Sequence, residues 1–94
     1  MVQADRIIVY KSEPCPFCTA AIRFLREMKG QTVDIVDITG DWDARIALRE
    51  QTGMRTVPQI YVGETHVGGF DDLRALDASG GLDPLLASVR SARG

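Results

Sequence analysis

The first 38 residues contain a strand, a helix and a second strand in succession, and this order constrains the fold more than any other feature. Residues 6–10 are mostly β-branched and aromatic, which predicts a short buried strand. Residues 16–29 carry apolar side chains at helical spacing, and Gly30 ends the pattern. Residues 32–38 again have the composition of a strand. Because strands joined through a helix pair in parallel, we expect a parallel pair covered by this helix. The helical side chains expected to face the core are Cys18, Ala21, Ile22, Leu25 and Met28.

The middle of the chain predicts a second helix. Asp41 can cap a helix that runs to about Gln51, and Gly53 follows it as a stop signal. Trp42 stands at the start of this helix. A single tryptophan in a small domain is more often part of the core than a surface group, so we expect Trp42 to cover the edge of the core.

The remainder predicts an antiparallel hairpin and two short helices. Residues 56–62 and 65–67 have strand composition and are joined by a glycine-first connection typical of a tight hairpin. One helix is expected over residues 71–76, and a last one over residues 84–91 with Asp83 as its cap. Together with the parallel pair, the hairpin predicts one α/β domain that spans the whole chain. Its expected architecture is a four-stranded mixed sheet with helices on both faces, in the order β-α-β-α-β-β-α-α.

Two cysteines, the only ones in the chain, lie between the first strand and the first helix. Cys15 falls at the helix N-cap, and Cys18 lies one turn later on the same face, close enough for a disulfide. The unpaired first-turn N–H groups and the helix dipole favour a thiolate at Cys15. Pro16 occupies the first helical position, where its missing N–H costs nothing. The pattern predicts that both cysteines are catalytic, with Cys15 as the exposed nucleophile and Cys18 as the resolving thiol.

Three other interpretations of the cysteine pair are open: a structural disulfide, half of a zinc site, or two inert buried thiols. A loop this short constrains the unfolded chain very little. Zinc prefers four ligands, and the chain offers only His66 as a further candidate, so we expect no metal site in a monomer. A proline between two inert cysteines at a helix start would be a coincidence. A Cys-x-x-Cys pair near a β-α-β unit is typical of redox chemistry.

Composition narrows the class of protein. The chain is 45% apolar and 26% charged, which is ordinary for a soluble globular domain. Its net charge of −2, without a basic cluster, gives no indication of nucleic-acid binding. No apolar run reaches membrane-spanning length, and residues 1–6 do not have the pattern of a signal peptide. We therefore expect a cytoplasmic monomer that contacts neither nucleic acid nor membrane.

Three motifs together resemble the glutaredoxins, the thioredoxin-fold oxidoreductases that use glutathione. They are Cys15-Pro16-Phe17-Cys18 after the first strand, Thr56-Val57-Pro58 before the hairpin, and Gly68-Gly69-Phe70-Asp71-Asp72 at the start of a helix. The resemblance covers nearly the whole chain, and residues 73–86 are similar to the short bacterial dithiol glutaredoxins of the glutaredoxin-three type. It implies a glutathione-dependent thiol–disulfide oxidoreductase that reduces protein disulfides and glutathione mixed disulfides. Glutathione would be a reducing co-substrate rather than a permanently bound cofactor, and ribonucleotide reductase is a partner that the family suggests.

The same resemblance implies a glutathione site. A cis Val57–Pro58 bond would leave the backbone of Val57 free to pair with the cysteinyl part of glutathione. Backbone N–H groups at the start of the third helix suit the γ-glutamyl carboxylate, and the Asp72 carboxylate suits the neighbouring ammonium. Arg45 in the second helix would bind the glycine carboxylate. The implied site residues are Phe17, Arg45, Thr56, Val57, Pro58, Gly69, Phe70, Asp71, Asp72 and Lys11.

The chain departs from the family pattern at three positions. The family usually has a lysine three residues before the first cysteine, whereas here this position is Ser12 and Lys11 precedes it. Alternation along an extended segment would turn Lys11 away from the site. Phe17 replaces the tyrosine that the family commonly has between the two cysteines. Phe70 stands where related short bacterial proteins often have a third cysteine.

Two alternative functions follow from the same motifs. Phe70 after a glycine also resembles glutathione-independent redoxins, which thioredoxin reductase would reduce. The other alternative is an iron–sulfur cluster carrier ligated through Cys15 and glutathione, against which the stiff Pro16 argues.

Overall fold

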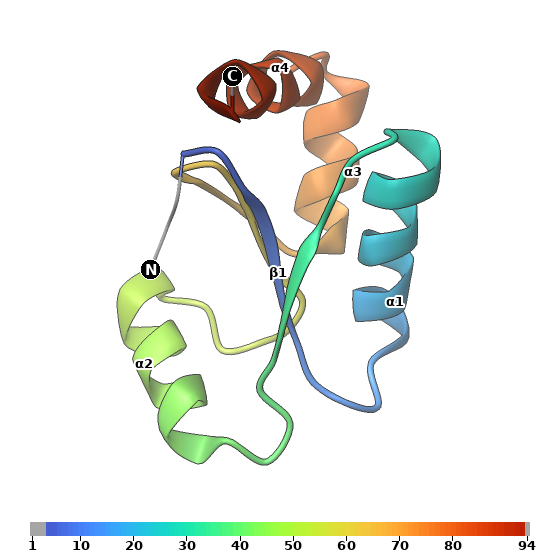
Figure 1. Ribbon diagram of the computed structural model, residues 1–94. Helices are drawn as coiled ribbons and strands as arrows, with labels where there is room; N and C mark the ends of the chain where they lie inside the picture. The colour runs from blue at the N-terminus through green and yellow to red at the C-terminus, as the bar shows by residue number, and fades with distance from the viewer. Residues whose placement is uncertain (1–3, 94) are drawn as a thin grey trace.

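A computed structural model describes residues 4–93 and contains one four-stranded sheet (Figure 1). The strands are β1 (Ile7–Lys11), β2 (Asp34–Asp37), β3 (Gln59–Val62) and β4 (Thr65–Gly68), in the spatial order β2-β1-β3-β4. Strand β1 runs parallel to β2 and antiparallel to β3, and β3 forms an antiparallel hairpin with β4. The predicted mixed sheet is therefore confirmed.

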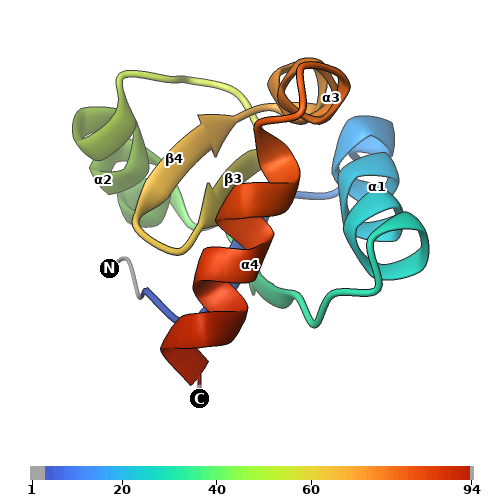
Figure 2. The same cartoon turned by 90° about the horizontal axis from the view of Figure 1, so that it is seen from above.

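Helices cover both faces of this sheet, as Figures 1 and 2 show. Helices α1 (Pro16–Arg23) and α3 (Phe70–Ala78) lie on one face, and α2 (Trp42–Thr52) lies on the other. Helix α4 (Leu82–Arg93) packs near the β3–β4 turn, where Val89 approaches Gly63. In the described part of the chain, no helix is both long and apolar enough to cross a membrane.

The boundaries of the last two helices differ from the expected ones. Helix α3 begins at Phe70 and extends to Ala78, beyond the expected Leu76. Helix α4 begins at Leu82 rather than Pro84, so Asp83 lies inside the first turn and the prediction that it caps the helix is wrong. The physical reason is the burial of Leu82, which is fully inside the core and draws the chain into helical conformation earlier.

Side chains at alternate positions of β1 and β3 belong to the hydrophobic core that lies between the sheet and helices α1 and α3. Ile7 pairs with Val62 and Val9 with Ile60 across the antiparallel β1–β3 ladder, and all four side chains are buried. Because side chains alternate between the faces of a strand, these four point to the same side. They pack against buried side chains of the helices, namely Ala21, Leu25, Leu73, Leu82, Leu86 and Val89.

The other face of the sheet packs against α2. Ile8 and Tyr61 are paired and buried there, and Leu48 from α2 is also buried. The Tyr61 hydroxyl accepts a hydrogen bond from Gln51 Nε2 at 2.8 Å, which ties the helix to the strand. Trp42 does not take part: its side chain is 72% exposed, so the prediction that it covers the core is wrong. Six residues separate it from Leu48, which rotates it by about 120° from the inward face of the helix.

Met28 is a second residue that the helical spacing misplaced. The predicted helix over residues 16–29 is present, but its last part is a π-helical turn, η1 (Phe24–Met28). The Lys29 N–H donates to Phe24 O at 3.2 Å, five residues back, and this wider turn departs from the 3.6-residue period. Leu25 is fully buried, as the helical spacing predicted, whereas Met28 at the end of the turn is 75% exposed.

Candidate active site

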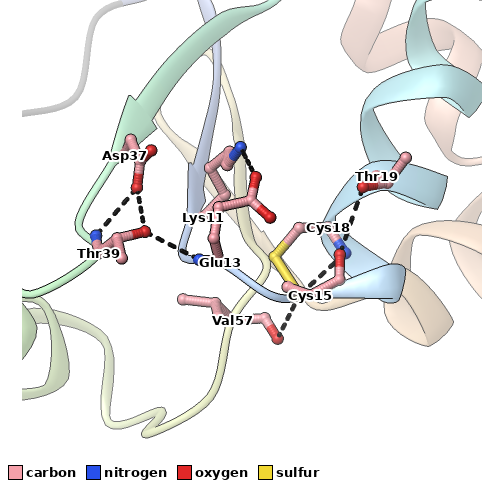
Figure 3. The surroundings of a disulfide bond; sticks show 8 residues. All are labelled: Lys11, Glu13, Cys15, Cys18, Thr19, Asp37, Thr39 and Val57. Carbon is pink, nitrogen blue, oxygen red and sulfur yellow. Dashed lines mark hydrogen bonds and ion pairs between the residues drawn. A yellow bond between two sulfur atoms is a disulfide. The ribbon is translucent and has the colours of Figure 1, made fainter.

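Cys15 and Cys18 form a disulfide at the start of α1, with their Cα atoms 5.2 Å apart (Figure 3). Cys15 is the N-cap residue, as expected, and has extended backbone angles of φ −153° and ψ 94°. The Cys18 N–H donates to the Cys15 sulfur at 3.1 Å. Cys18 is only 1% exposed, whereas Cys15 is half-buried, so an incoming thiol meets the Cys15 sulfur first.

The segment before β3 lies against the disulfide. The Val57 carbonyl oxygen is 3.8 Å from the Cys15 sulfur, and Figure 3 shows the two facing one another. The Val57–Pro58 bond is cis, which confirms the expectation for this position, and Pro58 is buried. The Glu13–Pro14 bond on the other side of the disulfide is also cis, which the sequence analysis did not anticipate.

A groove of about 330 Å³ is lined by Phe17, which lies between the two cysteines, and by Val57, whose carbonyl oxygen faces the Cys15 sulfur. Its volume lies within the range of small-molecule binding sites, so it is large enough for part of a peptide-sized ligand. Three segments that are far apart in the sequence contribute to it: the start of α1, the loop before β3 and the start of α3. The lining residues are Phe17, Met54, Thr56, Val57, Pro58, Gly69, Phe70, Asp71 and Asp72.

The groove thus brings together every residue of the predicted glutathione set except Arg45 and Lys11. Met54 is the lining residue that the sequence analysis missed. Its backbone carbonyl accepts a hydrogen bond from the buried Gln59 side chain at 3.1 Å, which holds the loop against β3. No local pattern marks a methionine in a loop as part of a site, because this contact forms only in the folded chain.

The first turn of α3 offers donors for an anion. Gly69 is its N-cap, and the Gly69 N–H donates to Asp72 Oδ2 at 2.9 Å. The N–H groups of Phe70 and Asp71 belong to the first turn, where helices leave backbone donors unpaired. A carboxylate in the groove can therefore find N–H groups and a favourable helix dipole at this end, with the Asp72 side chain close by.

Gly68 allows the Asp72 side chain to take this position. The residue has a left-handed φ of 110°, and a Cβ atom added there would collide with the Asp72 carboxylate. A side chain at this position would therefore displace Asp72 from the Gly69 N–H.

Lys11 is turned toward Glu13, with which it forms an ion pair (Figure 3). The hydrogen bond to Glu13 raises the pKa of the Lys11 ammonium, because it favours the charged form. The same loop is braced by Thr39, whose hydroxyl accepts from the Glu13 N–H at 2.8 Å and donates to Asp37. The Thr39 hydroxyl and the Thr39 backbone N–H both donate to the Asp37 carboxylate, and these two hydrogen bonds lower the pKa of Asp37. Lys11 does not line the groove.

Arg45 lies apart from the groove, in a second hollow of about 200 Å³. Helix α2 and the loop that follows it form this hollow. Its lining residues are Trp42, Arg45, Ile46, Arg49 and Arg55.

His66, the further zinc candidate, lies on β4 beside Tyr61, with the ring centroids 5.0 Å apart. Burial lowers the pKa of the imidazole, and the nearby Asp72 carboxylate opposes this shift in part. Within residues 4–93, no group of three or more His, Cys, Asp or Glu side chains is arranged to hold a metal ion.

Comparison with known proteins agrees with this geometry. Residues 7–67 match the glutaredoxin family. Glutaredoxin 3 of Escherichia coli strain K12 is 45% identical over 78 residues, which cover 83% of this chain and 93% of that protein. The solution structure of the Brucella melitensis glutaredoxin has a TM-score of 0.78 and 37% identity, with 92% of each chain covered. A crystal structure of a buckwheat glutaredoxin–glutathione complex has a TM-score of 0.78 and 29% identity, covering 88% of this chain and 77% of that one.

The order of the motifs, the sheet topology and these similarities lead to one assignment. The chain belongs to the glutaredoxin family, with close similarity to bacterial glutaredoxin 3, and is a glutathione-dependent disulfide oxidoreductase whose dithiol is formed by Cys15 and Cys18.

Proposed function

We propose that this protein reduces both glutathione mixed disulfides and protein disulfides through its Cys-Pro-Phe-Cys motif. The observation that carries the proposal is the position of the Cys15 sulfur, which caps a helix N-terminus beside the groove and is more exposed than Cys18. A sulfur in this environment is stabilised as a thiolate, the form that attacks disulfides.

The reaction with a mixed disulfide needs one thiol of the protein. The Cys15 thiolate attacks the glutathionyl sulfur, a new Cys15–glutathione disulfide forms, and the substrate leaves as a thiolate that takes up a proton. The thiolate of a second glutathione then attacks the glutathionyl sulfur of the adduct. Oxidised glutathione leaves, and Cys15 returns as a thiolate.

The reaction with a protein disulfide needs both cysteines. Cys15 attacks one sulfur of the substrate and forms a mixed disulfide, and the Cys18 thiolate then attacks Cys15. The substrate leaves as a dithiol, and the protein is left with the Cys15–Cys18 disulfide found in this structure. Two molecules of glutathione reduce this bond and leave as oxidised glutathione.

Glutathione would lie in the groove with its cysteinyl backbone against Val57. Its γ-glutamyl carboxylate would meet the first-turn N–H groups of α3, and its ammonium would meet Asp72. A buckwheat glutaredoxin with a similar fold was crystallised with glutathione, which supports a site of this kind. The remaining members of the proposed site are Phe17, Thr56, Pro58, Gly69, Phe70 and Asp71. Arg45 as the ligand of the glycine carboxylate stays a prediction, since it lies in the second hollow.

We further propose that the protein acts as a monomer in the cytoplasm, where reduced glutathione keeps such a pair available for turnover. Ribonucleotide reductase is a candidate substrate on family grounds alone.

A coupled assay tests the function. A glutathionylated peptide is supplied with glutathione, glutathione reductase and NADPH, and the oxidation of NADPH is followed. Cys15→Ser should abolish turnover, and Cys18→Ser should keep most of it while losing the reduction of protein disulfides. A parallel reaction with thioredoxin reductase in place of glutathione tests the redoxin alternative. Turnover in that reaction alone would show that the glutathione assignment is wrong, and an iron–sulfur absorption in the purified protein would favour the cluster carrier.

A further inference from the structure

The second hollow is unusual in its charge. Its lining includes three arginines, Arg45, Arg49 and Arg55, and no carboxylate. The ion pairs found among residues 4–93 involve Arg6, Lys11, Arg23 and Lys29, and none of these three arginines. The chain as a whole is acidic, with a net charge of −2, so this positive surface is a local feature. Its guanidinium groups are free to bind an external anion.

An aromatic side chain lies beside these charges. Trp42 is 72% exposed, and it is the only tryptophan of the chain. Trp42, Arg45 and Arg49 are spaced by three and four residues, which places them on one face of α2. Trp42 itself lies about 120° around the helix from the buried Leu48, which faces the sheet. Tryptophan and arginine are the residues most enriched where protein partners bind, and nothing in the fold of the described residues uses them.

The hollow is next to the active-site groove. Arg55 lines the hollow, and its chain neighbours Met54 and Thr56 line the groove. Both sites therefore share the loop before β3 as a wall. A polypeptide bound through a sulfur at Cys15 is longer than a tripeptide, and its next residues would extend over this wall.

We propose that the surface formed by Trp42, Arg49 and Arg55 docks an acidic segment of protein disulfide substrates. This inference rests on the proposed function. Carboxylates of the substrate would pair with Arg49 and Arg55, which can each form two parallel hydrogen bonds to one carboxylate. The indole of Trp42 would cover the apolar part of the same segment. Outside these arginines the chain carries a larger negative charge than the chain as a whole, so it would repel a long polyanion. A short acidic segment therefore fits the surface better.

The sole tryptophan makes docking directly measurable. The fluorescence of Trp42 is followed while an acidic peptide without cysteine is added to the oxidised protein, and an otherwise identical peptide with Asn and Gln in place of Asp and Glu serves as the control. We expect a saturable change with the acidic peptide only, weakened by added salt and lost in Arg49→Ala/Arg55→Ala. An equal response to inorganic sulfate or phosphate would show unspecific anion binding and overturn the proposal.

Kinetics test whether docking serves the reaction. Two peptides with an internal disulfide, one with an acidic and one with an amide flank, are compared by kcat/KM, with the flank placed at several distances from the reacting cysteine. For at least one spacing we expect the acidic peptide to be preferred about five- to thirty-fold, through electrostatic attraction and paired contacts. Arg49→Ala/Arg55→Ala should remove the preference, and Arg49→Glu/Arg55→Glu should reverse it.

Two controls separate the outcomes. Arg90 is an exposed arginine of α4, which packs near the Gly63 turn, and Arg90→Ala changes the net charge without touching the hollow. This variant should keep the full preference. Bis(2-hydroxyethyl) disulfide has no flanking segment, and all variants should reduce it at the wild-type rate. If the wild-type protein does not reduce bis(2-hydroxyethyl) disulfide, the proposed function is wrong. If the wild-type protein reduces it but shows no preference for the acidic peptide, only the docking surface is wrong. The same conclusion follows if Arg90→Ala loses the preference as fully as Arg49→Ala/Arg55→Ala does.

Discussion

Substituting Gly68 by alanine tests how the α3 end of the groove is built. Gly68 has φ 110°, a conformation that costs about 1–3 kcal/mol for a residue with a Cβ atom. The added Cβ would also collide with the Asp72 carboxylate and break its hydrogen bond from the Gly69 N–H, which is 2.9 Å long. Loss of such a helix-terminal hydrogen bond costs about 0.5–2 kcal/mol. The free energy of unfolding should therefore fall by about 1.5–5 kcal/mol in total.

Gly40 provides a matched control for the conformational cost of placing alanine at a positive φ. It has φ 73°, and a Cβ atom added there would meet nothing within 4 Å. Gly40→Ala should cost only the conformational part, about 1–2 kcal/mol. Urea denaturation of both variants, with the dithiol kept reduced, gives the two free energies. Because Gly68→Ala also displaces Asp72, it should raise the KM for glutathione, whereas Gly40→Ala should leave it unchanged.

A double-mutant cycle isolates the collision. In the Asp72→Ala background the carboxylate is absent, so Gly68→Ala should lose the part of its cost that comes from the collision and keep the conformational part, about 1–3 kcal/mol. If Gly68→Ala is equally destabilising with and without Asp72, or no more destabilising than Gly40→Ala, the steric argument fails.

Further predictions concern the site and its surroundings. The pKa of the reduced Cys15 thiol should lie well below that of a free cysteine, because the helix N-terminus stabilises the thiolate, and thiolate absorbance against pH measures it; a pKa at the free value would contradict the helix-terminus argument. Asp72→Ala and Arg45→Ala should each raise the apparent KM for glutathione between about two- and thirty-fold, without changing the pKa of Cys15. Lys11→Ala should raise this KM less. Steady-state kinetics with varied glutathione measures the KM of each variant. Burial lowers the pKa of His66, so the unfolded chain binds the extra proton more readily than the folded one. The free energy of unfolding should therefore fall as the pH drops through about 6.5. In His66→Gln the thermal unfolding midpoint should depend less on pH around this value.

Local sequence signals determined much of the fold. The strand–helix–strand order required a parallel β1–β2 pair, because a helical connection returns the chain to the same end of the sheet. Asp41 caps α2 through its hydrogen bond from the Ala44 N–H at 3.0 Å, as its position indicated. The N-cap position of Cys15 was equally predictable, since a strand, a proline at the first helical position and an apolar stripe surround it. The two helix caps depend on neighbours within a few residues, and the parallel pairing depends only on the order of the elements along the chain.

Tertiary structure alone decided the features that depend on the angular position of a helix or on contacts between distant segments. Trp42 and Met28 are apolar and helical, but whether they face the core depends on the phase of the helix and on a π-helical turn. The separation of Arg45 from the groove has the same origin, because α2 directs Arg45 to the same hollow as Trp42. Met54 joins the groove only when its loop docks against β3. A sequence shows which residues can bind or react, whereas their distances are set by the packing of helices on a sheet, which no local pattern encodes.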